Sequence, residues 1–175
     1  MTERSENDMA TDEYLLAIGR AVYAFACADF AMFYVISDFY PPFGYAKEVD
    51  YPTHFSLVKT PGKFKADLLA AVAGNILPID LKERYEKYSA EYGAISRLRN
   101  GLLHAWPFTA SDTSQQIGGN YFEPALPPIQ HRVEWSLDKL AEVTVRFRAN
   151  EAEGGNLRTA LKGFRAAPVA APEPI

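Results

Sequence analysis

The chain has 175 residues, of which 48% are hydrophobic and 23% charged, which excludes a disordered polypeptide and suits one domain with a real core. A net charge of −4 and a pI of about 5.4 exclude a protein that holds nucleic acid through its overall charge. The single cysteine, Cys27, excludes an internal disulfide, and we expect a cytoplasmic protein.

The first predicted helix runs from about Asp12, a good N-cap, to Phe39, and Pro41-Pro42 then stops it. Apolar side chains occupy nearly every side of this helix. Such a helix is central to a bundle or is shared between the core and a partner. Because Asp29 and two other charged residues interrupt the apolar run, we interpret it as a buried helix and not as a membrane span.

Two further helices follow along the chain. Thr60 as a capping hydroxyl and Pro61 as the first helical residue predict a helix that ends near Ile76 or Leu77. The third helix is predicted from about Asp80 to Ala105, before a proline.

The segment from Trp106 to Trp135 has a different composition, with four prolines, a Gly-Gly-Asn sequence and short alternating runs. It predicts a small antiparallel hairpin or an irregular loop. Ser136 is the expected N-cap of a fourth helix. Gly154-Gly155 is expected to break or bend that helix before a last helical piece at Leu157–Phe164.

These elements predict an all-α fold, namely a four- or five-helix bundle with a β-hairpin or irregular insertion between the third and fourth long helices. The helical domain would span residues 12–165. Residues 1–11 and the Ala/Pro-rich residues 166–175 are predicted to be flexible, because they have no core pattern.

Charge is distributed unevenly along the chain. Residues 1–50 hold three basic and nine acidic side chains, whereas residues 59–104 hold eight basic and five acidic ones. Residues 136–165 hold six basic and four acidic side chains. The two basic segments could form a local anion-attracting face, with Lys63 and Lys87 as candidates for nucleic-acid binding, or they could be ordinary mixed helix surfaces.

The hexapeptide Arg99–His104 carries the most specific chemistry of the chain. An arginine can clamp a phosphate with two parallel hydrogen bonds, and a histidine can exchange a proton near neutral pH. Asn100 and His104 are four residues apart and share a helix face. Arg99 and His104 are separated by about 140° around an ideal helix. Either Arg99 reaches around the helix, or the helix is distorted, or a second copy completes the site.

This hexapeptide resembles the R-N-x-x-x-H signature of the HEPN family, whose members are small all-helical domains. Many are metal-independent ribonucleases of toxin–antitoxin and defence systems. The resemblance implies that Arg99 binds the scissile phosphate and that His104 transfers a proton or orients the attacking 2′-hydroxyl. Asn100 would position the imidazole or the phosphate. It also implies a homodimer with a composite cleft, and an antitoxin or other protein partner.

Asp29 is the next candidate, because it lies in an otherwise apolar stretch where an unpartnered carboxylate would be costly. The resemblance implies that Asp29 holds Arg99 or His104 in place. The alternatives are a tyrosine hydroxyl as its partner, or simple exposure. One cysteine and three scattered histidines make no zinc pattern, and no cofactor motif is present.

Two functions therefore stay open. The first is a metal-independent endoribonuclease that acts on RNA as a homodimer. The second is a non-catalytic HEPN-like module that binds a nucleotide, RNA or a protein partner. The homodimer is also expected from the first helix, which carries more apolar surface than one small bundle needs.

Overall fold

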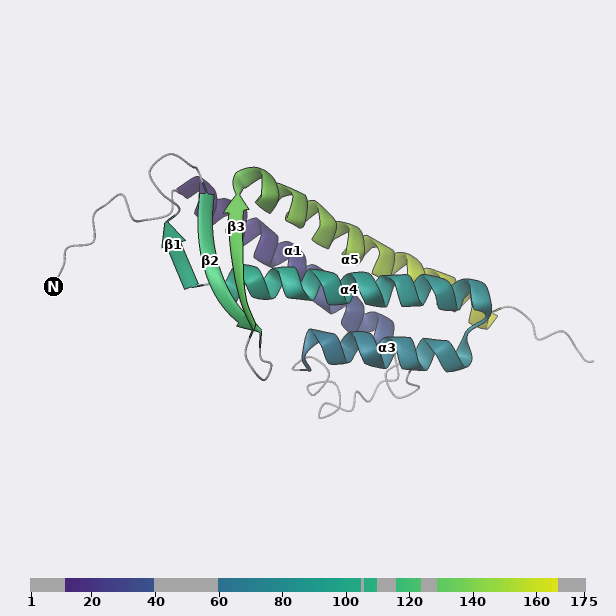
Figure 1. The fold of residues 1–175 in the computed structure, drawn as a ribbon. Coiled ribbons are helices and arrows are strands. Elements are labelled where there is room, and N and C mark those ends of the chain that lie inside the picture. The colour runs from purple at the N-terminus through teal and green to yellow at the C-terminus, as the bar shows by residue number, and fades with distance from the viewer. Residues whose placement is uncertain (1–11, 40–59, 105, 110–115, 124–128, 167–175) are drawn as a thin grey trace, which may run out of the picture. The chain divides into compact units, whose positions relative to one another are not determined.

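The computed structural model describes residues 12–39, 60–104, 106–109, 116–123 and 129–166 (Figure 1). This part of the chain is mostly helical, which confirms the coarse prediction. Its helices are α1 (Asp12–Ser37), α3 (Gly62–Ile76), α4 (Ile79–His104) and α5 (Leu137–Ala166). The predicted flexible residues 1–11 and 167–175 lie outside the described residues, whereas Ala166 is the last residue of α5.

The chain divides into two compact units that share the three long helices. The first unit consists of residues up to Ala28 together with Gly93–Ala149. The second unit consists of Asp29–Tyr92 together with the residues from Asn150 onward. The first unit therefore holds the Arg99–His104 motif, and the second holds Asp29 and all of α3.

A three-stranded antiparallel sheet belongs to the first unit (Figure 1). Its strands are β1 (Trp106–Thr109), β2 (Gln116–Glu123) and β3 (Ile129–Ser136), with β2 in the centre. Trp106 pairs with Asn120, and Gln116 pairs with Ser136. The insertion that the sequence predicted as a hairpin or irregular loop thus contains three paired strands.

The N-cap predicted for α5 is present in the structure, whereas the start predicted for α3 differs. Ser136 caps α5, since its Oγ accepts a hydrogen bond of 3.1 Å from the backbone N–H of Lys139, and this confirms the predicted N-cap. The start predicted for α3 is one residue early. The helix begins at Gly62, and Pro61 occupies the N-cap position without a side-chain cap.

The predicted break at Gly154-Gly155 is wrong, because α5 is one continuous helix from Leu137 to Ala166. A Cβ at position 154 would lie 2.7 Å from the hydroxyl oxygen of Tyr88 and 3.1 Å from Cβ of Ala31. Gly154 is therefore a point of close packing among helices of the second unit. The absent side chain makes room for a tyrosine instead of ending the helix.

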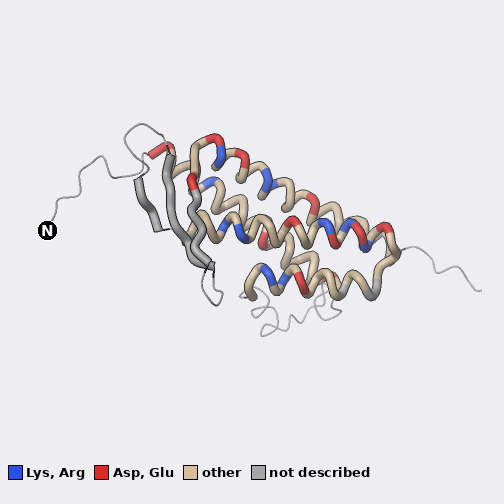
Figure 2. The backbone as a smooth tube through the Cα atoms, in the orientation of Figure 1, with Lys and Arg blue, Asp and Glu red and all other residues tan. Residues whose placement is uncertain are grey.

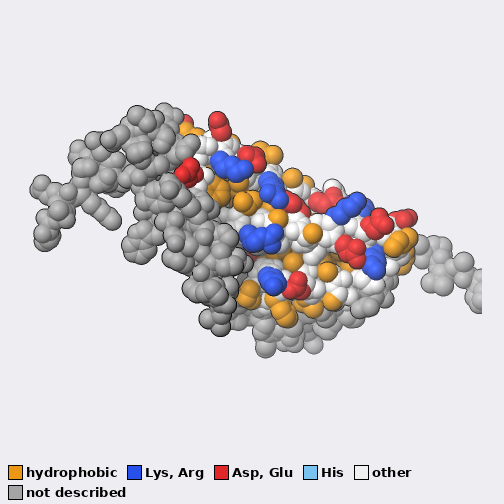
Figure 3. All heavy atoms as spheres, in the orientation of Figure 1, with side chains coloured by type: hydrophobic (Ala, Val, Ile, Leu, Met, Phe, Trp, Pro, Cys, Tyr) orange, Lys and Arg blue, Asp and Glu red, His pale blue; other side chains and the backbone are white. Residues whose placement is uncertain are grey.

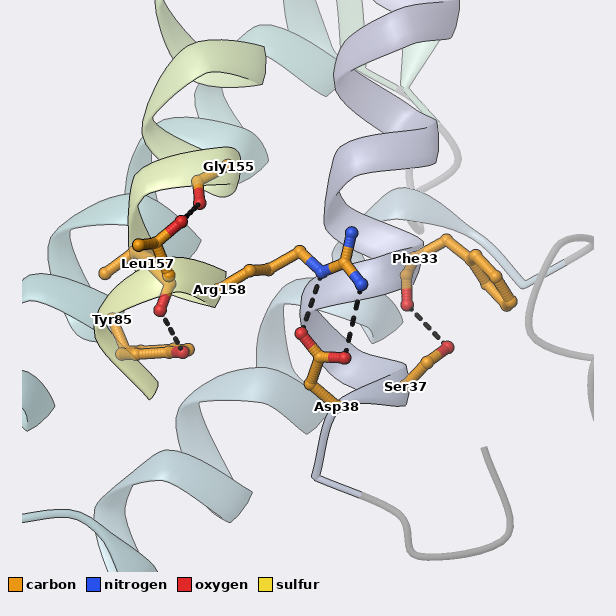
Figure 4. Close-up of polar contacts among 8 residues, drawn as sticks. Phe33, Ser37, Asp38, Tyr85, Gly155, Leu157 and Arg158 are labelled. Carbon is orange, nitrogen blue, oxygen red and sulfur yellow. Dashed lines mark hydrogen bonds and ion pairs between the residues drawn. The ribbon is translucent and has the colours of Figure 1, made fainter. Parts of the chain in front are cut away.

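Polar side chains join the helices of the second unit (Figure 4). Arg158 of α5 donates hydrogen bonds of 2.7 and 3.3 Å to the two carboxylate oxygens of Asp38, which follows the end of α1. The hydroxyl of the fully buried Tyr85 donates to the carbonyl of Leu157 at 3.1 Å. The turn that follows α1 and the buried face of α4 both contact α5 through these hydrogen bonds.

Candidate functional site

Arg99 of the first unit contacts Asn100 and Phe25. One guanidinium nitrogen, Nη1, donates a 3.1 Å hydrogen bond to Oδ1 of Asn100. The guanidinium carbon lies 5.6 Å from the centroid of the Phe25 ring of α1, within the range of a cation–π contact. Phe25 in turn meets Phe147 of α5 edge-on, with ring centroids 5.4 Å apart. The ring thus links the arginine to the packed interior of its unit.

Two residues of the motif, Asn100 and Leu103, face solvent on α4. Arg99 is half-buried and Asn100 is exposed. Leu103 is also exposed. His104 is the last residue of α4, and its side chain lies outside what the structure describes. The structure therefore places Arg99 and Asn100 together, while the distance to the imidazole stays a prediction.

The helices around Arg99 are locally basic. The part of α4 in the first unit, Gly93–His104, contains two arginines and no acidic residue. The part of α5 in the first unit, Leu137–Ala149, contains three basic residues, among them Arg146 and Arg148, and two acidic residues. Figure 2 shows Lys and Arg in blue and Asp and Glu in red along the helices. A phosphate approaching Arg99 would meet no carboxylate from Gly93–His104 of α4.

Asp29 lies in the second unit, where two side chains hold it. Nζ of Lys65 lies 2.7 Å from Oδ1 and 2.9 Å from Oδ2 of Asp29. The hydroxyl of Tyr92 donates a short hydrogen bond to Oδ1. Of the alternatives open for Asp29, the tyrosine hydroxyl is present. The cluster joins α1, α3 and α4.

Sequence reasoning missed Lys65. Its side chain is 3% exposed, whereas that of Asp29 is 30% exposed. A signal for this burial exists, because Lys65 precedes the buried Leu69 and Ala73 by one and two helical turns. A lysine on the apolar face of a helix needs a buried anion as a partner, and Asp29 is the carboxylate in the apolar stretch of α1.

Tyr88 lies in the same unit, and its hydroxyl has no hydrogen-bond partner among the described residues. Burial is the main cause that raises the pKa of Tyr88 above its ordinary value, and the negative charge of Asp29 adds to the effect. This hydroxyl stays protonated at any physiological pH.

The other predicted nucleic-acid contacts are surface residues. Lys63 of α3 and Lys87 of α4 are both exposed and belong to the second unit. Figure 3 shows Lys and Arg side chains spread among acidic ones on the face it presents. Among the residues that the structure describes, no group of three or more His, Cys, Asp or Glu side chains could hold a metal ion.

Comparisons with protein-family models, with curated proteins and with solved structures find no match. By length and composition alone, α1 could cross a membrane, with 22% of its most apolar window buried inside the structure. The core helix of a soluble protein passes the same test.

Proposed function

We propose that this chain is a HEPN-like, metal-independent endoribonuclease whose phosphate-binding group is Arg99. One observation carries the proposal. The Arg99 guanidinium is stacked on Phe25 and bonded to Asn100, which holds a permanent cation at the surface of a helix segment without carboxylates. A guanidinium fixed in this way has little conformational entropy left to lose when it binds a phosphodiester.

The reaction follows from the two groups of the motif. The 2′-oxygen of a ribose attacks the adjacent phosphorus, and the bond from phosphorus to the 5′-oxygen breaks. His104 takes up the proton of the 2′-hydroxyl, or orients that hydroxyl while water takes up the proton, and His104 or water then delivers one proton to the leaving 5′-oxygen. Arg99 stabilises the negative charge that builds up on the phosphoryl oxygens. The products are a 2′,3′-cyclic phosphate and a 5′-hydroxyl.

Asn100 acts as a positioning residue in this scheme. Its Oδ1 accepts a hydrogen bond from Arg99, so the amide orients the guanidinium fork. The separation of about 140° between Arg99 and His104 on an ideal helix supports a site completed by a second copy, with the arginine of one subunit beside the histidine of the other.

Cleavage of an RNA panel by the purified full chain tests the proposal. Arg99→Ala is expected to lower the cleavage rate about 100-fold or more, as does loss of a donor to a developing oxyanion. Arg97→Ala is the matched control, because it removes the same charge two residues away on an exposed position of the same helix. His104→Ala should be as inactive as Arg99→Ala, and EDTA should leave the wild-type rate unchanged.

Other variants distinguish the roles of individual residues in the site. Arg99→Lys should be a poor enzyme, since an ammonium cannot make the two-pronged phosphate contact. Asn100→Ala should cost less than loss of either partner. Lys63→Ala and Lys87→Ala should act on RNA affinity and lose their effect at high salt.

The competing function is a non-catalytic module that binds a nucleotide, RNA or a protein partner. If the wild type cuts no RNA of the panel but binds RNA or a nucleotide through Arg99, the competing function replaces the nuclease. If neither cleavage nor binding differs between Arg99→Ala and Arg97→Ala, both functions are rejected.

A further inference from the structure

Two buried polar side chains of the second unit have no hydrogen-bond partner among the described residues. They are the hydroxyl of Tyr88 on α4 and the amide oxygen Oδ1 of Asn150 on α5, in residues that are 2% and 3% exposed. An unpaired polar group in the interior is destabilising, so nearly all such groups bond to protein or to an ordered water. The two atoms complement each other, because a tyrosine hydroxyl can donate a hydrogen bond and an amide oxygen only accepts one.

Gly154 relates the positions of these two side chains. A Cβ at position 154 would lie 2.7 Å from the Tyr88 hydroxyl oxygen, so this oxygen lies against α5 at Gly154. Asn150 precedes Gly154 by four residues, and residues four apart share a helix face with their Cβ atoms about 5–6 Å apart. All three residues belong to the second unit. The hydroxyl and the amide thus lie about one helical turn apart along α5 and form no direct hydrogen bond.

We propose that an ordered water molecule binds between Tyr88 and Asn150 and joins α4 to α5. The water accepts a hydrogen bond from the Tyr88 hydroxyl and donates one to Oδ1 of Asn150. Two O–H···O hydrogen bonds in series span about 5.5 Å, which is the length of one helical turn. One molecule of water therefore satisfies both of the unpaired atoms.

The carboxylate of Asp29 on α1 can accept the second hydrogen of this water. Among the described residues, Oδ2 of Asp29 accepts one hydrogen bond, from Lys65, and a carboxylate oxygen has two acceptor sites. The charge of Asp29 also contributes to the raised pKa of Tyr88, so the carboxylate acts electrostatically on the hydroxyl. With Asp29 as a partner the water makes three hydrogen bonds, the number typical of buried water.

The water site does not depend on whether the chain cleaves RNA. Its residues belong to the second unit, whereas Arg99 belongs to the first. Failure of the cleavage assay would leave the water site intact, and loss of the water site would leave the chemistry proposed for Arg99 unchanged.

A double-mutant cycle in the full chain tests the bridge. Tyr88→Phe should raise the equilibrium constant of unfolding in urea about five- to tenfold, because it leaves the water and Asn150 without their donor. After Asn150→Leu, the same change from Tyr88 to Phe should have little effect, since the bridge is already broken. If the Tyr88 hydroxyl is an unpaired group, its removal lowers the unfolding constant or leaves it unchanged, and either result overturns the proposal.

Tyr85→Phe is the matched control for the cycle. The Tyr85 hydroxyl is also buried on α4 but donates directly to the carbonyl of Leu157 (Figure 4). Its loss should raise the unfolding constant by the same factor with and without Asn150→Leu, because no water connects these two residues. If Asn150→Leu changes the effect of Tyr85→Phe as much as that of Tyr88→Phe, the coupling belongs to helix packing and the bridge is rejected.

A high-resolution crystal structure of the full chain tests the site directly. It should show a water within hydrogen-bond distance of the Tyr88 hydroxyl and of Oδ1 of Asn150. The crystal structure of Tyr88→Phe should lack this water. An Asn150 amide bonded directly to the hydroxyl in wild type, or an empty space between the two atoms, overturns the proposal.

Discussion

Asp29 and Arg99 are both charged residues of long helices, and their surroundings differ. In the second unit, the Asp29 carboxylate accepts hydrogen bonds from Lys65 and Tyr92, and the lysine is almost fully buried. In the first unit, Arg99 contacts a ring face and one amide oxygen and stays half-buried. A buried charge with buried partners stabilises a packing arrangement. A half-buried guanidinium beside an amide and a ring can still be reached from solvent.

The comparison predicts opposite consequences of mutation at the two sites. Changes in the Asp29 cluster should alter the free energy of unfolding, and changes at Arg99 should alter function with little effect on folding.

Asp29→Ala should have the largest effect on stability. It would leave the ammonium of Lys65 buried without its anion, and breaking a buried pair in this way costs about 3 kcal/mol in the free energy of unfolding. Chemical denaturation measures the change. Asp67→Ala removes the same charge from an exposed position of α3 and should stay within about 0.5 kcal/mol of wild type.

A double variant separates loss of the pair from loss of the charge. Asp29→Ala with Lys65→Met removes both ions and should recover much of the lost stability, because a buried ion pair can often be replaced by apolar side chains. Equal stability of Asp29→Ala and Asp67→Ala would contradict the structural role assigned to Asp29.

Gly154→Ala should have the next largest effect. The new Cβ would lie 2.7 Å from the Tyr88 hydroxyl oxygen, so α5 or the ring must shift, at a cost of about 1–3 kcal/mol. Gly155→Ala meets nothing within 4 Å and should stabilise the helix by up to about 1 kcal/mol. Adding Tyr88→Phe to Gly154→Ala should recover part of the cost. Thermal melts in which both alanines behave alike would refute the close packing.

The contrast between these two glycines shows which features of the fold could not be predicted from the sequence. Periodicity, prolines and the Ser136 cap placed the four helices within a few residues, because these signals act within one helical turn. The Gly-Gly pair was misinterpreted as a break, since its reason is Tyr88, a residue far away in the sequence. The number of strands in the insertion was likewise undecided, because strand pairing depends on non-local contacts.

The candidate site, too, could be predicted from the sequence only in part. The motif around Arg99 was accessible from the sequence, because its residues are neighbours on one helix. The partner of Asp29 was not, since the choice among Lys65, a tyrosine and Arg99 depends on how α1, α3 and α4 pack together. A rule that buried lysines need buried carboxylates would have suggested Lys65 from the apolar phase of α3.

Tyr88 adds a smaller, pH-dependent effect within the second unit. Burial raises the pKa of its hydroxyl above the unfolded value of 10.0, so the folded state binds more protons than the unfolded state once the pH exceeds 10. Stability is therefore complete below pH 10 and falls above it, by up to about 1.4 kcal/mol per pH unit. Between pH 10 and pH 11, urea denaturation should show the free energy of unfolding falling for wild type but not for Tyr88→Phe. Parallel curves would mean that the ionised tyrosine is accommodated.

Of these variants, Arg99→Ala should change the free energy of unfolding least, in contrast to Asp29→Ala. The variant loses the cation–π contact with Phe25 and the hydrogen bond to Asn100 at a half-exposed position, and such contacts stabilise a fold by about 0.5–1 kcal/mol. Its melting temperature should stay within a few degrees of wild type, while RNA cleavage or binding falls sharply. Asp29→Ala should show the reverse, with a low melting temperature and near-normal function below it. If Arg99→Ala instead unfolds the protein as strongly as Asp29→Ala does, the arginine holds the bundle together, and the assignment of Arg99 to a phosphate is wrong.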